Sequence, residues 1–388
     1  MTAPARGFPR SEYEARVARA QQGMVSAGLD AVLLTTEADI RYVTGFLTRF
    51  WESPTRPWYV LLPAAGSPVA VIPAIGAALM ERTWVSDIRT WNAPDPEDDG
   101  VSLLADTIRS VVGSSARLGV PMMMESHLRM PLSDWHRLQT MVPSVDFTDD
   151  ADTMRRIRMV KSEAEIAKVR HACAIAGRAF DRVPEIARAG VPLDRVFRQF
   201  QSLCLDEGAD WVPYLAGAAD RAGYHDVISP ADDRPLANGD VLMLDTGLIW
   251  DGYFCDFDRN FAVGKPLEQV TSAHARLIEA VRAGMDMARP GAMASDLFHA
   301  MDRVLGDGER STDAGRLGHG LGLQLTEGLS LIARDNTMLQ AGMIITLEPG
   351  ITLANGRILV HEEDIVIREG GAEYLSPPAS GDIVVLGG

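Results

Sequence analysis

The stretch that decides the fold is GDVLMLDTGLIWDGYFCDFDRNFAVG, residues 239–264. Its two halves, VLMLDTGLI and YFCDFDRNFAV, are typical of strands, and WDG between them is typical of a hairpin turn. A hairpin that folds midway between Trp250 and Asp251 places Asp245 directly opposite Asp256, on one face of the sheet. Two like charges in that relation are destabilising unless a cation lies between them, so the pair indicates a metal site.

Other interpretations of this aspartate pair stay open at this point. Either carboxylate could cap a turn or pair with Arg259, and a β-bulge would change the register. Whether the aspartate pair binds a metal ion depends on which other candidate ligands the rest of the chain contains.

Three further segments carry isolated polar residues in apolar surroundings. AGMIITLEPGI (341–351) is a strand-like run with one charge, Glu348, and GRILVHEEDIVI (356–367) places Glu362 and Glu363 on opposite faces of a strand. A lone carboxylate in a buried strand needs a partner or a metal. In LGHGLGLQLTEG (317–328), His319 could be a turn residue, a core residue, a catalytic base or a metal ligand.

Taken together, these segments supply one set of candidate ligands: Asp245, Asp256, His319, Glu348 and Glu362. Two divalent ions would balance the four carboxylates, and oxygen-rich ligation with one imidazole suits Mn²⁺, Co²⁺, Zn²⁺ or Fe²⁺. Two such ions about 3.5–4 Å apart can activate water and polarise a carbonyl. With the rest of a site present, a ligand is the favoured interpretation of His319.

Composition excludes several classes of partner. The chain has 388 residues and a formal net charge of −16, which argues against nucleic acid or an anionic membrane surface as the main partner. Its three cysteines are widely spaced, which suits a reducing cytoplasm rather than a disulfide framework. We expect no secretory signal at the N-terminus and no membrane span.

The chain length predicts two domains. Residues 11–28 predict a helix that starts with a capping box at Ser11 and Glu14, and the segments DAVLLTT, WYVLLP and VAVIP predict strands. Another capping box, Ser162 with Glu165, starts a long helix after a change in charge between about residues 148 and 160. We therefore place an α/β domain at residues 1–155 and a second domain at 156–388. Helical stretches near 162–188 and 266–288, each followed by another helix and by strands, suggest a duplicated unit.

At the candidate ligands the chain resembles the pita-bread metallopeptidase superfamily (peptidase M24). The motifs are D-x-G with the second Asp eleven residues on, G-H-G-x-G, E-P-G and the E-x-D-I-V-I ending. The likeness covers nearly the whole chain and is nearest to the aminopeptidase P/prolidase/creatinase branch. It implies an α/β (α+β) fold, with a creatinase-like N-terminal α/β domain before a duplicated pita-bread domain.

Carried over residue by residue, the resemblance makes Asp245, Asp256, His319, Glu348 and Glu362 the ligands of two metal ions, with Glu362 as the bridging glutamate. Glu348 would also shuttle a proton during catalysis. His225, in AGYHDVISPADD, matches a histidine that contacts substrate in the metal enzymes of the branch and serves as general acid/base in creatinase.

One position departs from the peptidase pattern. Peptidases of the branch carry a second histidine seven residues after the ligand histidine, whereas this chain has Thr326. Threonine can donate a hydrogen bond but cannot shuttle a proton near neutral pH. The departure puts the proline-peptidase interpretation in doubt and leaves the ligands intact.

Three functional hypotheses follow. The leading one is a dinuclear metal-dependent hydrolase of a C–N bond in a small peptide or amide, similar to Xaa-Pro aminopeptidases and dipeptidases, with His225 and Thr326 orienting the substrate. The alternative is a creatinase-like hydrolase, or a lyase of the dimethylsulfoniopropionate type, acting on a small zwitterionic solute. The third is a non-catalytic binding module, which the complete ligand set disfavours.

The segment 44–58 is rich in aromatic residues. Its tryptophans Trp51 and Trp58 could face a substrate cation or pack at a domain or dimer interface. By analogy with the branch, we expect a homodimer with this segment near the active site, and we count Trp51 among the substrate-binding candidates.

Overall fold

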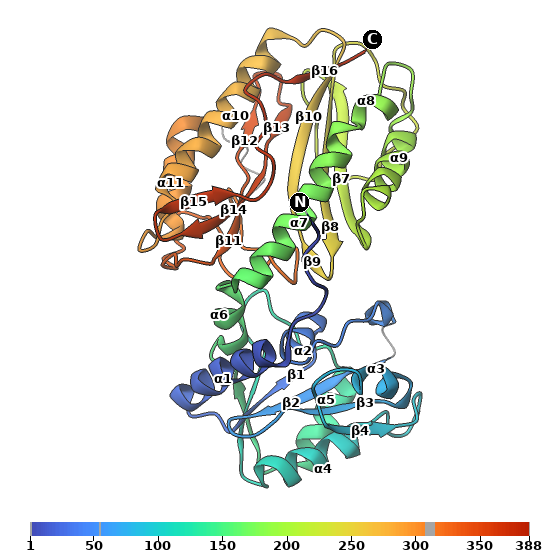
Figure 1. Cartoon of the computed structure of the whole chain (residues 1–388), viewed down its shortest axis with the longest axis vertical. Coiled ribbons are helices and arrows are strands. Elements are labelled where there is room, and N and C mark those ends of the chain that lie inside the picture. Colours follow the sequence, from blue (N-terminus) through green and yellow to red (C-terminus); the bar gives the residue numbers. More distant parts are fainter. Residues whose placement is uncertain (1, 54–55, 307–314, 388) are drawn as a thin grey trace. The chain divides into compact units, whose positions relative to one another are not determined.

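The computed structural model describes residues 2–53, 56–306 and 315–387. Two compact units are present: residues 5–158 form one, and residues 159–388 with the first few residues of the chain form the other. Figure 1 shows the elements of each unit. Among the described residues, no helix has both the length and the apolar character that crossing a membrane requires.

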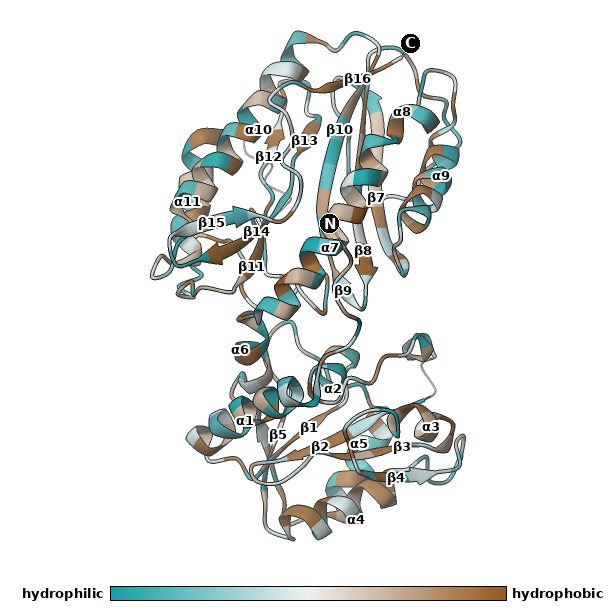
Figure 2. Ribbon diagram, viewed as in Figure 1, coloured by the Kyte–Doolittle hydropathy of each residue, from teal (hydrophilic) through white to brown (hydrophobic). Residues whose placement is uncertain are grey.

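The N-terminal unit is built on a six-stranded mixed sheet with the order β4-β3-β2-β1-β5-β6. Its strands are β1 (Ala31–Leu34), β2 (Tyr59–Pro63), β3 (Val69–Pro73), β4 (Asp87–Trp91), β5 (Arg117–Val120) and β6 (Asp146–Asp149). The first three strands are fully buried and confirm the three predicted from apolar runs. Their side chains share a core with one face of the amphipathic helix α4 (Val101–Val112), on which Figure 2 shows hydrophobic and hydrophilic residues.

The first helix corrects one sequence prediction. Helix α1 (Arg10–Ala27) ends at Gly28, whose φ of 67° is the left-handed conformation that favours glycine, as expected. It begins one residue before Ser11, however, and Pro9 occupies the N-cap position without a side-chain hydrogen bond. The predicted capping box at Ser11 is therefore wrong, because proline already fixes the backbone at the entry to the helix. The other helices of this unit are α2 (Glu37–Thr44), α3 (Ala77–Met80), α5 (Leu132–Met141) and α6 (Thr153–Met159), with short 3₁₀ turns at Phe50–Glu52 and Ala74–Gly76.

The larger unit consists of two halves, in each of which helices precede strands. In the first half, α7 (Glu163–Asp181), α8 (Val183–Ile186) and α9 (Leu193–Asp206) precede the antiparallel strands β7 (Trp211–Arg221), β8 (Asp240–Trp250), β9 (Tyr253–Phe254) and β10 (Phe257–Val263). In the second half, α10 (Glu268–Met287) and α11 (Ala294–Leu305) precede β11 (Ile344–Leu347), β12 (Gly350–Thr352), β13 (Ile358–Val360), β14 (Glu363–Arg368) and β15 (Gly371–Tyr374). Helices α7 and α9 flank the first sheet, α10 and α11 flank the second set of strands, and β16 (Val384–Leu386) returns to pair with β10 (Figure 1).

The predicted capping box at the start of α7 is present. The Ser162 hydroxyl accepts the backbone N–H of Glu165, and the Glu165 carboxylate accepts the backbone N–H of Ser162. This fixes the first residue of the helix that opens the larger unit.

The decisive hairpin forms, but in a different register from the one predicted. Trp250 pairs with Tyr253, so the turn consists of Asp251 and Gly252, both with positive φ. Such a two-residue turn shifts the pairing by two positions, and Asp245 lies opposite Asp258 rather than Asp256. The predicted direct pairing of Asp245 with Asp256 is therefore wrong. Asp256 instead lies in the break between β9 and β10.

Candidate metal centre

Three of the predicted ligands meet in a buried cluster. The ligand atoms of Asp256, His319 and Glu362 all lie within 4.8 Å of one another. The His319 Nε2 atom is 3.4 Å from Asp256 Oδ2 and 3.8 Å from Glu362 Oε1. Asp256 comes from the first half of the unit and the other two come from the second half.

A contact with a backbone carbonyl identifies the nitrogen of His319 that faces the cluster. Its Nδ1 atom lies 3.0 Å from the carbonyl oxygen of Gly320. A carbonyl can only accept, so Nδ1 carries the proton and Nε2 presents a lone pair to the two carboxylates. Burial and the positive charge of Arg316 lower the pKa of His319 to about 4, which keeps the ring neutral. A neutral imidazole oriented through its other nitrogen is the form that ligates metals.

Asp245 and Glu348 interact with the residues of this cluster through their charges. Asp245 lies in the middle of β8, and Glu348 directly follows β11. Burial raises the pKa of Asp245 well above its usual range, and repulsion from Asp258 and Glu348 adds to the effect. Burial likewise raises the pKa of Glu348 to about 7, against the opposing charge of Arg316. Burial also raises the pKa of Asp256 and of Glu362, and repulsion from the charges of Asp245 and Glu348 raises both pKa values further.

The donor set fits divalent metal ions. The atoms Asp245 Oδ1, Asp256 Oδ1 and Glu362 Oε1 are buried, and among the described residues they have no hydrogen-bond partner. Buried carboxylate oxygens without partners are costly, and metal coordination is one of the few ways to satisfy several at once. Oxygen ligands with one imidazole match Mn²⁺, Co²⁺, Zn²⁺ or Fe²⁺.

Neighbouring side chains orient the ligand-bearing backbone. The Asp364 carboxylate accepts the backbone N–H of Asp256 at 2.9 Å. Asp258 Oδ1 accepts the backbone N–H of Glu362 at 3.1 Å and lies 3.1 Å from His361 Nδ1. The backbone on both sides of the cluster is therefore held by buried acidic side chains.

The alternative roles considered for the acidic residues are not observed. Arg259 pairs with Glu363 at 3.0 Å rather than with Asp245 or Asp256. Glu363 thus points away from the cluster that Glu362 joins, as the strand alternation predicts. The buried Glu327 is paired with Lys161 at 2.8 Å.

The remaining candidates lie in different surroundings. Thr326 Oγ1 accepts a hydrogen bond from Arg316 Nη2 at 3.1 Å, whereas His225 is exposed in the loop after β7. Trp51 is buried within the N-terminal unit, where its ring packs 5.8 Å from that of Trp58, with Arg129 5.2 Å from the Trp51 ring centroid. The roles of these residues toward substrate stay predictions.

Sequence reasoning missed two side chains near the cluster. Tyr214 of β7 shares a hydrogen bond with Asp245, and burial raises the pKa of its hydroxyl. Arg316 acts electrostatically on Glu348 and His319. A cation three residues before a candidate ligand histidine was the one available indication of Arg316.

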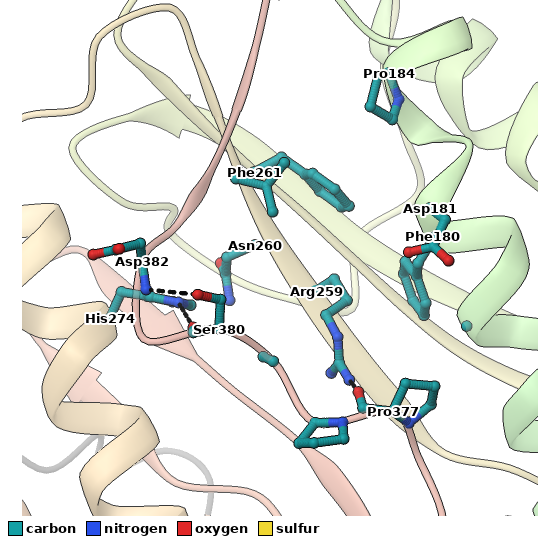
Figure 3. Close-up of a pocket in the computed structure, with 14 residues that line it drawn as sticks. Phe180, Asp181, Pro184, Arg259, Asn260, Phe261, His274, Pro377, Ser380 and Asp382 are labelled. Atoms are coloured by element: carbon teal, nitrogen blue, oxygen red, sulfur yellow. Dashed lines mark hydrogen bonds between the residues drawn. The ribbon is translucent and has the colours of Figure 1, made fainter.

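A separate pocket of about 250 Å³ lies along β10 (Figure 3). It is lined by Phe180, Arg259, Asn260, His274 and Ser380 among others, and the His274 ring nitrogen Nε2 lies 3.1 Å from the Ser380 carbonyl oxygen. None of the predicted ligands lines this pocket, so the candidate centre is the carboxylate–histidine cluster.

Comparison with known proteins identifies the family of the chain. Residues 167–369 match the model of metallopeptidase family M24, and residues 16–160 match the creatinase/prolidase N-terminal domain. The probable dipeptidase PepE of Mycobacterium tuberculosis is 30% identical over 372 residues, covering 93% of each chain. The crystal structure of dipeptidase PepE from Mycobacterium ulcerans matches with a TM-score of 0.83 and 28% identity, over 98% of this chain and 100% of that one. The X-Pro aminopeptidase of Thermotoga maritima, at 23% identity, has the same fold with a TM-score of 0.81, over 95% of this chain and 99% of that one.

The family match spans more than half of the chain and contains all five candidate ligands. The duplicated helix–strand halves and the creatinase-like N-terminal unit are as the resemblance implied. The chain belongs to metallopeptidase family M24 and is a metal-dependent hydrolase with the pita-bread fold.

Proposed function

We propose that this hydrolase is dinuclear and cleaves the C–N bond of a small peptide or amide, with Xaa-Pro dipeptides as the first substrates to test. The observation that carries the proposal is the cluster of Asp256, His319 and Glu362, with Asp245 and Glu348 beside it. Three of its buried carboxylate oxygens are without hydrogen-bond partners among the described residues. Similar proteins named as dipeptidases support the peptide substrate.

The five ligands would hold two divalent ions, Mn²⁺, Co²⁺, Zn²⁺ or Fe²⁺, which supply Lewis acidity to the scissile carbonyl and activate water. Glu348, half-buried at the edge of the cluster, is the proposed carrier of a proton to the departing nitrogen. His225 is the proposed general acid/base or substrate contact, and Thr326 orients the substrate. Trp51 is the proposed substrate contact from the N-terminal unit.

A second candidate function rests on Thr326. Because this position holds a hydroxyl paired with Arg316 and no histidine, a creatinase-like hydrolase or a lyase acting on a small zwitterionic solute is the alternative. Creatine, ectoine and dimethylsulfoniopropionate are the solutes to compare with the peptides.

We also propose a homodimer in the cytoplasm, with residues 1–155 as the creatinase/prolidase-like domain and residues 156–388 as the catalytic domain. The three cysteines are free and buried, which supports a reducing compartment. Light scattering of the purified protein tests the dimer.

Metal content per chain is the deciding measurement. Elemental mass spectrometry of protein purified without chelator and supplied with Mn²⁺ should give two ions per chain, and Asp245→Ala should lose metal and activity together. Hydrolysis of Xaa-Pro dipeptides supports the peptidase, whereas turnover of the solutes alone supports the alternative. A protein that binds no metal and works in chelator contradicts the dinuclear mechanism.

A further inference from the structure

A buried ion pair supports the loop that follows His319. Lys161 Nζ lies 2.8 Å from Glu327 Oε1, and the two side chains are only 2% and 6% exposed. Lys161 directly precedes the capping box that starts α7, whereas Glu327 lies eight residues after His319. The pair therefore connects the first helix of the larger unit to the loop of a proposed metal ligand.

Backbone hydrogen bonds fix both members of the pair. The Lys161 N–H donates to the Gly342 carbonyl oxygen at 3.0 Å, just before β11. The Glu327 N–H donates to the Gly320 carbonyl oxygen at 2.8 Å and so closes the loop between these two residues. The lysine thus presents its charge from a fixed backbone, and the glutamate carries the closing contact of the loop.

The Gly320 carbonyl oxygen makes a second contact. It lies 3.0 Å from Nδ1 of His319, and this contact leaves Nε2 to face Asp256 and Glu362. One oxygen therefore accepts both the imidazole N–H and the Glu327 N–H. Because the ion pair fixes Glu327, the orientation of the His319 ring depends on it.

The backbone of the loop packs directly against the ion pair. A Cβ atom on Gly322 would lie 2.8 Å from Lys161 Cε and closer still to the Glu327 carboxylate, so no other residue fits there without a shift. The Gly322 carbonyl oxygen also accepts the Phe254 N–H of β9 at 2.8 Å. The path of the loop between His319 and Glu327 is thus set by the pair on one side and by β9 on another.

A buried ion pair contributes little net stability, because the cost of taking two charges out of water offsets most of their attraction. We propose that Lys161 and Glu327 are positioning residues for His319, and that through the Gly320 carbonyl oxygen they hold the imidazole in the orientation that metal binding requires. This inference rests on the proposed role of His319 as a metal ligand and adds the residues that orient it.

The test is binding of Co²⁺ to the metal-free full chain, measured by calorimetry and by visible absorption, which responds to the arrangement of the ligand atoms. Lys161→Met combined with Glu327→Gln removes both charges at similar volume, so this double variant should keep its thermal stability. It should nevertheless bind Co²⁺ about 10- to 100-fold more weakly and with a changed spectrum, as for other residues that orient ligands. Lys161→Met alone should show the same binding defect and also lose stability, because it leaves the Glu327 charge buried without its lysine.

A second buried ion pair of the same unit supplies the matched control. Lys168 pairs with Asp251 at the hairpin turn, and these side chains are as deeply buried, at 1% and 6% exposed. Lys168→Met combined with Asp251→Asn removes this pair in the same way. It should leave the affinity for Co²⁺ and the spectrum as in the wild type.

The outcomes separate this inference from the proposed function. Wild-type affinity and spectrum in the Lys161 and Glu327 double variant would overturn the positioning role and leave the metal centre in place. An equal change in the control pair would also overturn it, because the effect would then come from general loosening of the fold. A wild type that takes up no Co²⁺ would remove the dinuclear centre and this role with it. Should Lys161→Met fail to fold, the double variant decides the question.

Discussion

Asp258 Oδ1 lies 3.1 Å from His361 Nδ1, and the same oxygen accepts the backbone N–H of Glu362. Asp258 belongs to β10 and lies opposite Asp245 in the sheet, whereas His361 immediately precedes Glu362. The pair therefore connects the strand opposite one proposed ligand, Asp245, to the backbone of another, Glu362.

Removing the charge of Asp258 tests this support. Asp258→Asn leaves all five proposed ligands in place but weakens the hydrogen bonds to His361 and to the Glu362 backbone. We expect metal affinity to fall by about 10- to 100-fold, as for other outer-shell partners. Calorimetric titration with Mn²⁺ measures it, with the exposed Asp382→Asn as control. An unchanged affinity would show that Asp258 only fills space.

Glu362→Gln should have opposite effects with and without metal. In chelator, the variant removes one buried carboxylate from a cluster of like charges, so its free energy of unfolding should rise by about 1–3 kcal/mol. With Mn²⁺ present, the wild type should gain stability by binding metal, and the variant should gain little. Thermal unfolding under both conditions measures this, and Glu369→Gln, at an exposed glutamate, should follow the wild type. A metal-free variant less stable than the wild type would contradict the prediction.

Thr326→Val removes the hydroxyl that holds Arg316 at nearly constant volume. Losing one hydrogen bond of about 1 kcal/mol should raise KM for the dipeptide that Thr326 is proposed to orient about 5-fold, with kcat largely kept. Steady-state kinetics measures the split, with Thr352→Val of β12 as the matched control. A fall in kcat at constant KM would instead place Thr326 in the chemical step.

Asp150, in the N-terminal unit, gives a pH-dependent prediction. Burial raises its pKa to about 6, and repulsion from Asp149 and Asp39 adds to the effect. The folded state thus favours the protonated form, so this group's ionisation costs stability as pH rises from about 4 through 6. Asp150→Asn should raise the free energy of unfolding by about 1 kcal/mol at pH 7.5, after allowance for solvent screening. Near pH 4 the substitution should leave the free energy of unfolding unchanged. Denaturant unfolding at both pH values measures the difference, and the exposed Asp146→Asn should show none.

The sequence predicted which candidate residues gather, three of which meet in the buried cluster, better than it predicted their geometry. Asp245, Asp256, His319, Glu348 and Glu362 could be identified because each is an isolated polar residue in an apolar run or a family motif. The register of the hairpin could not be predicted, because WDG allows turns of different length. Only the folded backbone shows that Asp251 and Gly252 both take positive φ.

The missed residues have a different cause. Tyr214 lies among unremarkable neighbours in sequence, and Arg316 is marked only by its place before the histidine motif. Only folding brings the tyrosine hydroxyl to Asp245 and the guanidinium to Thr326. Pairings between segments that are distant in the chain leave little trace in local patterns, whereas the capping box at Ser162 is local and was predicted correctly.

The proposed ligands are divided between the two halves of the larger unit: Asp245 and Asp256 come from the first, and His319, Glu348 and Glu362 come from the second. Neither half alone offers a complete coordination shell, so tight metal binding has to wait until both have folded and docked. Metal uptake during refolding would accordingly mark the end of folding.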